Sequence, residues 1–211
     1  MFKKQLLSTV AGFLILAPVA SADSGDAWNV DPMHSNAHFS VRHMMISNVE
    51  GDLGHISGSV NYDGKALSKA TVEATIDTST INTREPNRDE HLKSAEFFDT
   101  AKYPTISFKS KSIDPSDNDK FKLTGELTIH GVTKQVVLDA EKTSTIKDMH
   151  GNTRMGASAK TTLNRKDFGL SWNKQLDNGG AVVGDDVYVV LNLELVKAKT
   201  ASTADSTKTN Q

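Results

Sequence analysis

The sequence of 211 residues predicts an all-β protein in which eight antiparallel strands form a closed barrel or a two-sheet sandwich. Three observations predict this class: apolar and polar residues alternate with a period of two in eight segments, turn residues separate several of these segments, and only one stretch has a helical pattern. Strands with one polar face pair in antiparallel fashion, because parallel strands buried on both faces appear as continuous apolar runs. Closure into a barrel has the advantage that it leaves no unpaired strand edges.

The first segment, residues 1–22, has the pattern of a secretory signal peptide that is cleaved on export. Lys3 and Lys4 supply the positive start, residues 6–17 form the apolar run, and residues 20–22 supply small residues at a cleavage site. The alternative is a retained membrane anchor, but the run is shorter than the roughly 20 apolar residues of a membrane span. No later stretch is apolar enough to span a membrane, so we expect a released protein without stable membrane insertion, periplasmic in a Gram-negative cell.

The eight predicted strands follow, each with small or apolar residues on one face. In chain order these positions are Ala37/Phe39/Val41, Ile56/Gly58/Val60, Val72/Ala74/Ile76, Ile106/Phe108, Phe121/Leu123/Gly125/Leu127/Ile129, Val136/Leu138/Ala140, Met155/Ala157/Ala159 and Val187/Val189/Leu191/Leu193/Leu195. Turn signals lie at Asp63-Gly64, His130-Gly131, His150-Gly151-Asn152 and Asn178-Gly179-Gly180.

One helix is predicted, over residues 86–95, because a proline suits its first position. Asp89 lies in the first turn, where a negative charge favours the exposed backbone N–H groups. We expect Leu92, with Phe97 and Phe98 just after it, to dock the helix so that it closes or flanks one end of the barrel. The alternative is that Asp89 and its charged neighbours act as a catalytic acid and base.

The last segment, residues 198–211, is rich in Thr, Ser and Ala and contains no large apolar side chain. Such a segment cannot offset its ordering entropy by burial, so a disordered polar tail is predicted. The barrel domain is therefore expected to span residues 23–197.

Composition excludes several classes of function. A formal net charge of -2 argues against a nucleic-acid partner, because such a protein needs a basic face. The absence of cysteine from the sequence excludes disulfides, thiolate nucleophiles, zinc ribbons and iron–sulfur clusters.

The inward positions of the predicted strands carry no charge, so the interior is either a packed core or a ligand cavity. Several of these positions are small: Ala37, Gly58, Ala74, Gly125, Ala140, Ala157 and Ala159. In an eight-stranded barrel, side chains fill the interior or leave room for one small ligand. The small residues favour a cavity, whereas small residues that face large ones would give a filled core.

Several motifs recur in a characteristic order and together resemble the YceI-like family of exported bacterial proteins over roughly residues 28 to 196. They are Trp28-Asn29-Val30-Asp31, His34-Ser35, Phe39-Ser40-Val41-Arg42-His43-Met44, Thr83, residues 88–94, Phe97-Phe98-Asp99, residues 103–108, residues 125–134 and Asn164-Arg165-Lys166-Asp167-Phe168-Gly169. The resemblance implies an eight-stranded antiparallel lipocalin-like β-barrel with a long apolar tunnel that holds a polyisoprenoid chain. It also implies a periplasmic or secreted location, and it links members to stress response or isoprenoid-quinone handling.

We therefore expect a protein that sequesters or carries a polyisoprenoid or another long apolar lipid, and not an enzyme. The predicted tunnel wall consists of the large inward side chains Phe39, Val41, Phe108, Leu127, Ile129 and Leu191, and the predicted mouth consists of Phe97, Phe98, Phe168 and Trp172. The oligomeric state stays open, a homodimer included. A fully packed barrel without a ligand is one alternative.

A second alternative is an enzyme that acts on an isoprenoid head group, with His34, His43 or Asp89 as acid or base. A metal site is not expected, because His38 and His43 would point to opposite faces of a strand and no HExxH pattern is present. Residues 117–119 lack the downstream residues of a calcium loop. No catalytic residue, metal or cofactor is therefore expected.

Overall fold

The computed structural model describes residues 26–117, 119–177 and 179–199. The predicted signal peptide and residues 200–211 of the predicted tail lie outside the described residues, as do Asn118 and Asn178 of two predicted loops. Within the described ranges, no helix combines the length and the apolar character that crossing a bilayer requires.

The described residues are mostly in strands. The strands are β1 (Ala27–Val30), β2 (Asn36–His43), β3 (Ser47–Asp52), β4 (His55–Asn61), β5 (Thr71–Asp77), β6 (Thr105–Asp117), β7 (Lys120–Ile129), β8 (Val132–Lys142), β9 (Ile146–Lys147), β10 (Thr153–Asn164) and β11 (Val183–Lys197). The helix is α1 (Pro86–Lys93), and short 3₁₀ turns are η1 (Leu67–Lys69), η2 (Thr78–Thr80) and η3 (Arg165–Phe168).

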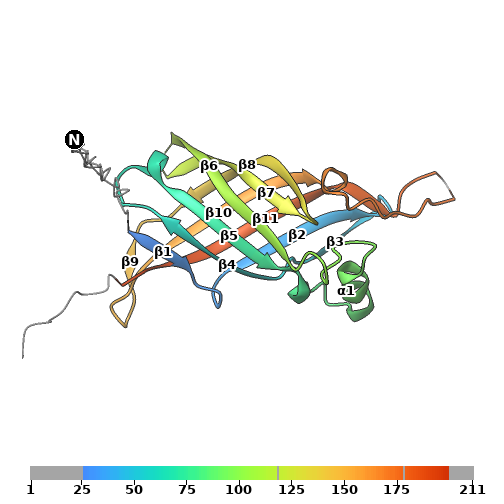
Figure 1. The fold of residues 1–211 in the computed structure, drawn as a ribbon, viewed down its shortest axis with the longest axis horizontal. Coiled ribbons are helices and arrows are strands. Elements are labelled where there is room, and N and C mark those ends of the chain that lie inside the picture. Colours follow the sequence, from blue (N-terminus) through green and yellow to red (C-terminus); the bar gives the residue numbers. More distant parts are fainter. Residues whose placement is uncertain (1–25, 118, 178, 200–211) are drawn as a thin grey trace, which may run out of the picture.

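The sheet closes on itself with all neighbours antiparallel (Figure 1). Around the ring the order is β11, β1, β4, β5, β6, β7, β8 and β10, and β10 returns to β11. That last pairing runs from Arg154↔Val196 to Asn164↔Asp186 and completes the barrel. The prediction of an eight-stranded antiparallel barrel is confirmed, and the sandwich alternative is wrong.

Two of the eight ring positions are interrupted strands. β1 pairs with the C-terminal end of β11, and β2 continues along the same side of β11 as far as His43↔Val183. In the same way β4 pairs with β1, whereas β3 pairs with β2. β1, β3 and β9 escape the alternation pattern because β1 has 4 residues, β9 has 2, and Val49 is the only large apolar residue of β3.

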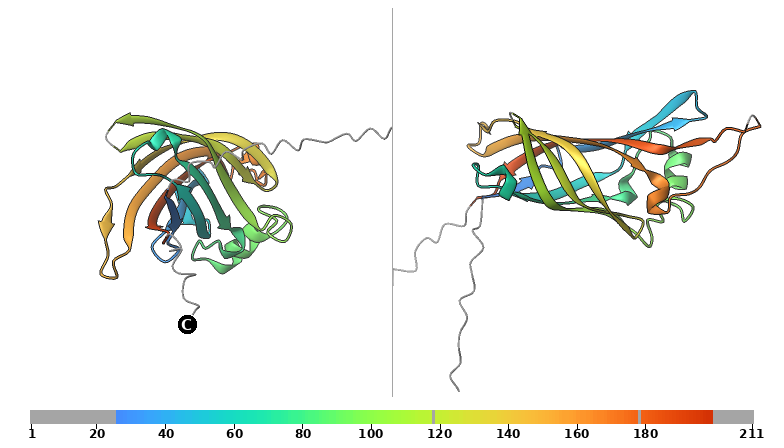
Figure 2. Two further views of the ribbon diagram at one scale, coloured as in Figure 1. Left: turned by 60° about the vertical axis from the view of Figure 1, so that its left-hand side comes forward. Right: turned by 90° about the horizontal axis from the view of Figure 1, so that it is seen from above.

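The barrel has two different ends (Figure 2). At one end, called here the Arg154 end, β1 and β10 begin and β11 finishes; at the opposite end, the Trp172 end, β11 begins and β2 and β3 meet in a hairpin. The buried core is divided accordingly into two clusters. One contains Trp28, Tyr62, Ala70, Ile113, Phe121, Leu123, Leu138, Ala140, Met155, Ala159 and Leu195, and the other contains Ala37, Phe39, Ile56, Ile76, Ile81, Phe97, Phe98, Ile106, Leu127, Ile129, Phe168 and Leu170.

Helix α1 forms where it is predicted but ends at Lys93, two residues earlier than expected. The Glu85 side chain caps its first turn by accepting hydrogen bonds from the backbone N–H groups of Asn87 (3.2 Å) and Arg88 (2.6 Å). Asp89 plays a different part, since its Oδ1 accepts hydrogen bonds from the backbone N–H (2.8 Å) and hydroxyl (2.5 Å) of Thr83. The carboxylate ties the helix to the loop before it.

Two of the small inward residues reflect close packing rather than empty space. A Cβ at Gly125 would overlap the ring of Phe108 on the neighbouring strand, and a Cβ at Gly58 would overlap the backbone of β5. An aromatic ring that lies over a strand glycine in this way fills the space that the missing side chain leaves. These two glycines are therefore no evidence for a cavity.

Candidate functional site

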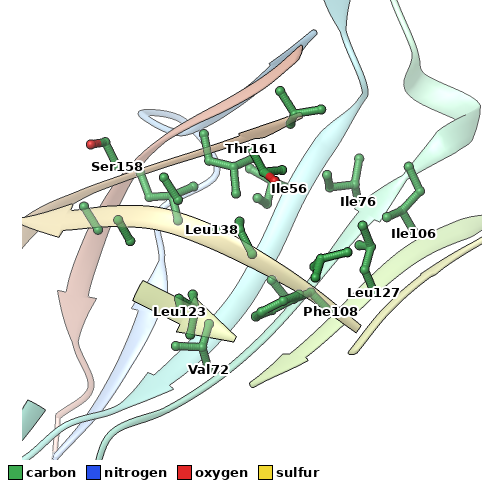
Figure 3. Close-up of a pocket in the computed structure, with 18 of the residues that line it drawn as sticks. Ile56, Val72, Ile76, Ile106, Phe108, Leu123, Leu127, Leu138, Ser158 and Thr161 are labelled. Carbon is green, nitrogen blue, oxygen red and sulfur yellow. The ribbon is translucent and has the colours of Figure 1, made fainter. Parts of the chain in front are cut away.

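An apolar cavity of about 200 Å³, the main cavity, lies inside the barrel. Figure 3 shows large side chains from strands on different sides of the ring directed toward this common space, among them Ile56, Ile76, Ile106, Phe108, Leu123, Leu127 and Leu138. A cavity needs only about 10–15 Å³ to hold one water molecule, so this space is far larger than a packing defect. The alternative of a fully packed barrel is therefore wrong.

Four polar side chains at the main cavity, those of Lys142, Ser158, Thr161 and Arg165, have polar partners within the protein. The hydroxyl of Thr161 donates to the carbonyl of Val137 at 3.0 Å, and that of Ser158 donates to Glu141 at 3.3 Å. The Lys142 ammonium group forms an ion pair with Asp119. A ligand in this space would therefore be held by burial of apolar surface rather than by hydrogen bonds.

A second cavity, also of about 200 Å³, adjoins the main cavity at the Trp172 end. It lies between β2, β3, α1 and the loop after η3, and both cavities are lined by Leu53, Phe98, Arg165, Leu170 and Val187. These five residues therefore form a shared wall between the two cavities.

All ten residues predicted to contact a ligand line one of the two cavities. Phe98, Phe108, Leu127, Ile129, Phe168 and Leu191 line the main cavity, and Phe39, Val41, Phe97, Phe98 and Trp172 line the second. The division into wall and mouth differs from the prediction: Phe168 is only 2 % exposed and belongs to the deep wall, whereas Phe39 and Val41 lie toward the end. Their contacts with a ligand remain predictions.

Arg165 occupies the shared wall and is only 5 % exposed. Its guanidinium group donates to the backbone carbonyls of Leu170 (2.5 Å), Trp172 (2.8 Å) and Gly184 (2.8 Å). Burial lowers the pKa of this group from its ordinary value, and the carboxylate of Asp185 acts in the opposite direction. Arg165 thus fastens the loop after η3 to the beginning of β11.

An aromatic cluster joins α1 to that loop at the second cavity. The His91 ring lies edge-on to Trp172 and Phe97, with centroids 4.8 and 5.0 Å away, and the rings of Phe97 and Trp172 are 5.1 Å apart. Glu96 holds His91 through a 2.6 Å contact between Oε2 and Nε2. This contact between helix and loop carries no periodic signal in the sequence, as is also true of Leu53 and Leu170.

A charged network occupies the Arg154 end. The Arg154 guanidinium group donates to Asp31 (2.7 Å), Asp148 (2.7 Å) and Glu194. His34 Nδ1 lies 3.1 Å from Asp31, and Arg154 together with His34 lowers the pKa of Asp31 to about 2. Asp31, His34 and Glu194 have ligand atoms within 4.8 Å of one another, and the Arg154 guanidinium group donates to both of these carboxylates.

The two histidines of the alternative enzyme do not share a site. His34 belongs to the Arg154 end, whereas His43 lines the second cavity at the opposite end. His38 pairs with Asp52, with 2.9 Å between Nδ1 and Oδ1. Asp89 already accepts two hydrogen bonds from Thr83.

Comparisons with known proteins agree with this architecture. A family model described as the YceI-like domain matches residues 28–195. A UPF0312 protein of Shewanella baltica is 33% identical over 168 residues, which are 80% of this chain and 88% of the relative. A UPF0312 protein of Staphylococcus aureus is 36% identical over 158 residues, which are 74% of this chain and 90% of the relative.

Among solved structures, the chain is similar to the YCEI protein of Campylobacter jejuni, with 31% identity, a TM-score of 0.62, and coverage of 75% of this chain and 90% of that one. BcnA of Burkholderia cenocepacia shares the fold at 21% identity, with a TM-score of 0.69 and coverage of 78% and 98%. A polyisoprenoid binding domain from Saccharophagus degradans also shares it, at 15% identity, with a TM-score of 0.62 and coverage of 82% and 99%. These solved structures share the closed antiparallel barrel fold of this chain.

Proposed function

The chain belongs to the YceI-like family, and we propose that it is an exported carrier that holds an elongated apolar lipid, a polyisoprenoid or an isoprenoid quinone, inside its barrel. One observation carries the proposal: the main cavity is enclosed by apolar side chains from seven of the eight ring strands, all except β1, and it shares five lining residues with the second cavity. The Saccharophagus degradans domain of the same fold, described as polyisoprenoid-binding, supports the ligand class.

Burial of the lipid supplies the free energy of binding. Each CH₂ group removed from water contributes about 0.8 kcal/mol, so a few isoprene units contribute several kcal/mol. A charged head group would find no unpaired counter-ion in the main cavity, because Lys142 and Arg165 already have partners within the described chain. The head group is therefore expected to remain at an end of the barrel.

Size determines how the chain would lie. An apolar cavity of about 150 Å³ accepts a molecule the size of benzene. Each of the two cavities, at about 200 Å³, holds only a short segment of lipid. A longer chain must occupy both cavities and displace apolar side chains of the shared wall, such as Leu53 and Phe98.

The predicted signal peptide supports the same role. Residues 1–22 have the pattern of a signal peptide, so the proposed location is the periplasm, the aqueous space between two membranes in a Gram-negative cell. A lipid with a long isoprenoid chain is almost insoluble there. A small barrel that shields the chain from water would let it leave one membrane and travel.

The experiment is lipid identification followed by a steric block. Protein purified from the periplasm of an expressing cell should release an isoprenoid lipid on solvent extraction, and delipidated protein should be stabilised thermally by polyprenols or quinones. Ala140→Phe fills the main cavity from β8 and should abolish the shift, whereas Val137→Phe, on the outer face of the same strand, should leave it intact. No extractable lipid and no thermal shift would overturn the proposal.

A further inference from the structure

The turn between β2 and β3 is unusual in its backbone. β2 ends at His43 and β3 begins at Ser47, and these two residues pair, so the loop has three residues: Met44, Met45 and Ile46. Within it, the N–H of Ile46 donates to the carbonyl of His43 at 3.1 Å. Met44 and Met45 both have positive φ angles, 49° and 63°. Two successive residues with positive φ in a hairpin turn favour the sequence Asn-Gly, because the Cβ atom of most other residues disfavours the left-handed conformation.

The same turn is unusual in its exposure. Met44, Met45 and Ile46 are 39%, 58% and 77% exposed, and they are consecutive. A sequence selected only for folding in water would place polar residues and glycine here. Both the backbone conformation and the exposure of apolar surface are unfavourable in the isolated molecule, and such features concentrate at functional sites.

We propose that this turn, the Met44–Ile46 tip, is a docking element that inserts into the surface of a lipid bilayer. The hairpin projects beyond the body of the barrel at the Trp172 end (Figure 2). Val41 and Val49, from the two strands that carry the tip, line the second cavity, as does His43. An inserted tip therefore places the second cavity next to the acyl chains.

Charge at the base of the tip fits the same partner. The exposed guanidinium group of Arg42 donates to the carbonyl of Met45 at 3.1 Å and to Asn48 Oδ1 at 3.3 Å. When three apolar side chains enter the acyl region, a cation at their base lies at the level of the lipid phosphates. The neighbouring segment 174–182 contacts the tip, since the carbonyl of Val182 accepts a hydrogen bond from Met44 N (2.8 Å). This segment contains one cation, Lys174, and one anion, Asp177, so it adds no net charge.

A bilayer fits better than a soluble protein, because the proposed cargo is itself a membrane lipid; in this respect the inference rests on the proposed function. Cargo that passes directly from acyl chains into an apolar cavity avoids water at every step. A second copy of the chain is the rival occupant of the tip, and the experiment separates the two.

The decisive variant is Met44→Asn with Met45→Gly, combined with Ile46→Thr. Asn-Gly suits the positive φ angles, and threonine keeps the β-branch of Ile46 in the turn before β3, so the variant should unfold at the same temperature as the parent chain or higher. Its binding to vesicles of phosphatidylcholine and phosphatidylglycerol, measured by flotation, should fall by about tenfold or more, since it loses the three apolar anchors. Met149→Ser is the matched control: Met149 is 94% exposed, but it lies at the Arg154 end, and its loss should leave flotation unchanged.

Three readouts decide the outcome. Flotation that is equal for the parent chain and the tip variant would overturn the proposal, as would a parent dimer, seen by light scattering, that becomes a monomer in the variant. Uptake of polyprenol from detergent micelles, in which no bilayer takes part, should be equal in both proteins. If the parent chain floats with vesicles but takes up no polyprenol, the proposed function fails while the docking element stands.

Discussion

The two ends of the barrel each contain an arginine and a tryptophan, but in different surroundings. At the Arg154 end, Arg154 donates to three carboxylates and Trp28 is buried in the core. At the Trp172 end, Arg165 donates to backbone carbonyls, and Trp172 is partly buried and lines the second cavity. Trp28 donates from Nε1 to the carbonyl of Tyr62 at 3.2 Å within a dense apolar cluster. Trp172 instead contacts two rings of α1 and its following loop.

The difference indicates that the two ends have different roles: one closes the barrel and the other gives access to its interior. The Arg154 end joins β1, β10 and β11 through side chains that are distant in sequence, which makes it a rigid closure. At the Trp172 end the helix contacts the loop after η3 through the rings of His91 and Trp172, and that loop meets the hairpin through one backbone hydrogen bond, from Met44 N to the carbonyl of Val182. Access to the interior is therefore expected at the Trp172 end, and the following variants test that expectation.

The largest effect is expected from Trp28→Ala. Trp28 is 3% exposed, and its removal leaves a cavity and an unpaired carbonyl at Tyr62. The loss of stability should be about 3–5 kcal/mol, measured by urea unfolding. If Trp28→Ala costs less than Trp172→Ala, the Arg154 end is not the more rigid one.

A somewhat smaller loss is expected from Arg165→Met. The variant keeps the apolar stem but removes the donors for the carbonyls of Leu170 and Trp172, so stability should fall by about 3 kcal/mol in the same assay. Arg165→Lys restores a charge without the planar set of donors and should recover only part of the loss. Full recovery by lysine would show that charge, rather than the carbonyl contacts, is what matters here.

Trp172→Ala should change kinetics more than stability. The side chain is partly buried, so we expect a loss of only about 1 kcal/mol from the ring contacts with His91 and Phe97. A bound fluorescent polyprenol analogue should leave the protein faster in stopped-flow measurements, because the second cavity has lost part of its cover. Trp172→Phe keeps a ring and should behave like the parent chain, and an unchanged release rate in the alanine variant would place the route elsewhere.

The smallest effect is a pH dependence specific to the Arg154 end. Hydrogen bonds from Arg154 first and His34 second lower the pKa of Asp31 from 3.8 to about 2, and Arg154 also lowers the pKa of Asp148. A depressed folded-state pKa contributes stability above the unfolded value and loses it as the pH falls, so this part should vanish between about pH 4 and pH 2.

The control for this pH dependence is Arg154→Met. It should lower stability at neutral pH and flatten the slope in the acid range. Asp77 and Asp63, whose pKa values are lowered by hydrogen bonds of their own, should still contribute to acid unfolding. An identical acid profile in Arg154→Met would show that the network contributes nothing to stability.

Much of the ring could be predicted because alternation reports which face of a strand is buried. The predicted inward residues number five in β7, three in β10 and five in β11, and they alternate strictly with outward residues. All of them except Gly125 line the main cavity. The interruption between β1 and β2 has no such signal. It depends on how both strands pair with β11, which is a property of the closed sheet.

The second cavity illustrates what alternation cannot show. Its walls come from β2, β3, α1 and the loop after η3, and Trp172 meets His91 only once all four are in place. The role of Asp89 is hidden for a similar reason: its position in the helix indicates a dipole effect, whereas its partner Thr83 lies in the preceding loop. The surroundings of Gly125 could not be predicted for another reason. A small residue is equally compatible with an empty space beside it and with a neighbouring ring that fills that space.

The interruption of the two N-terminal strands has one more consequence. Beyond its bridge from Asp52 to Asn82, β3 has no strand partner on its outer side within the described residues, so the wall there is a seam of side chains without a hydrogen-bonded ladder. In the proposed carrier, a prenyl chain longer than the barrel need not be threaded lengthwise or coiled up. Parting the wall at this seam breaks no ladder of backbone hydrogen bonds, so we expect such a chain to enter sideways here and to leave its surplus length outside.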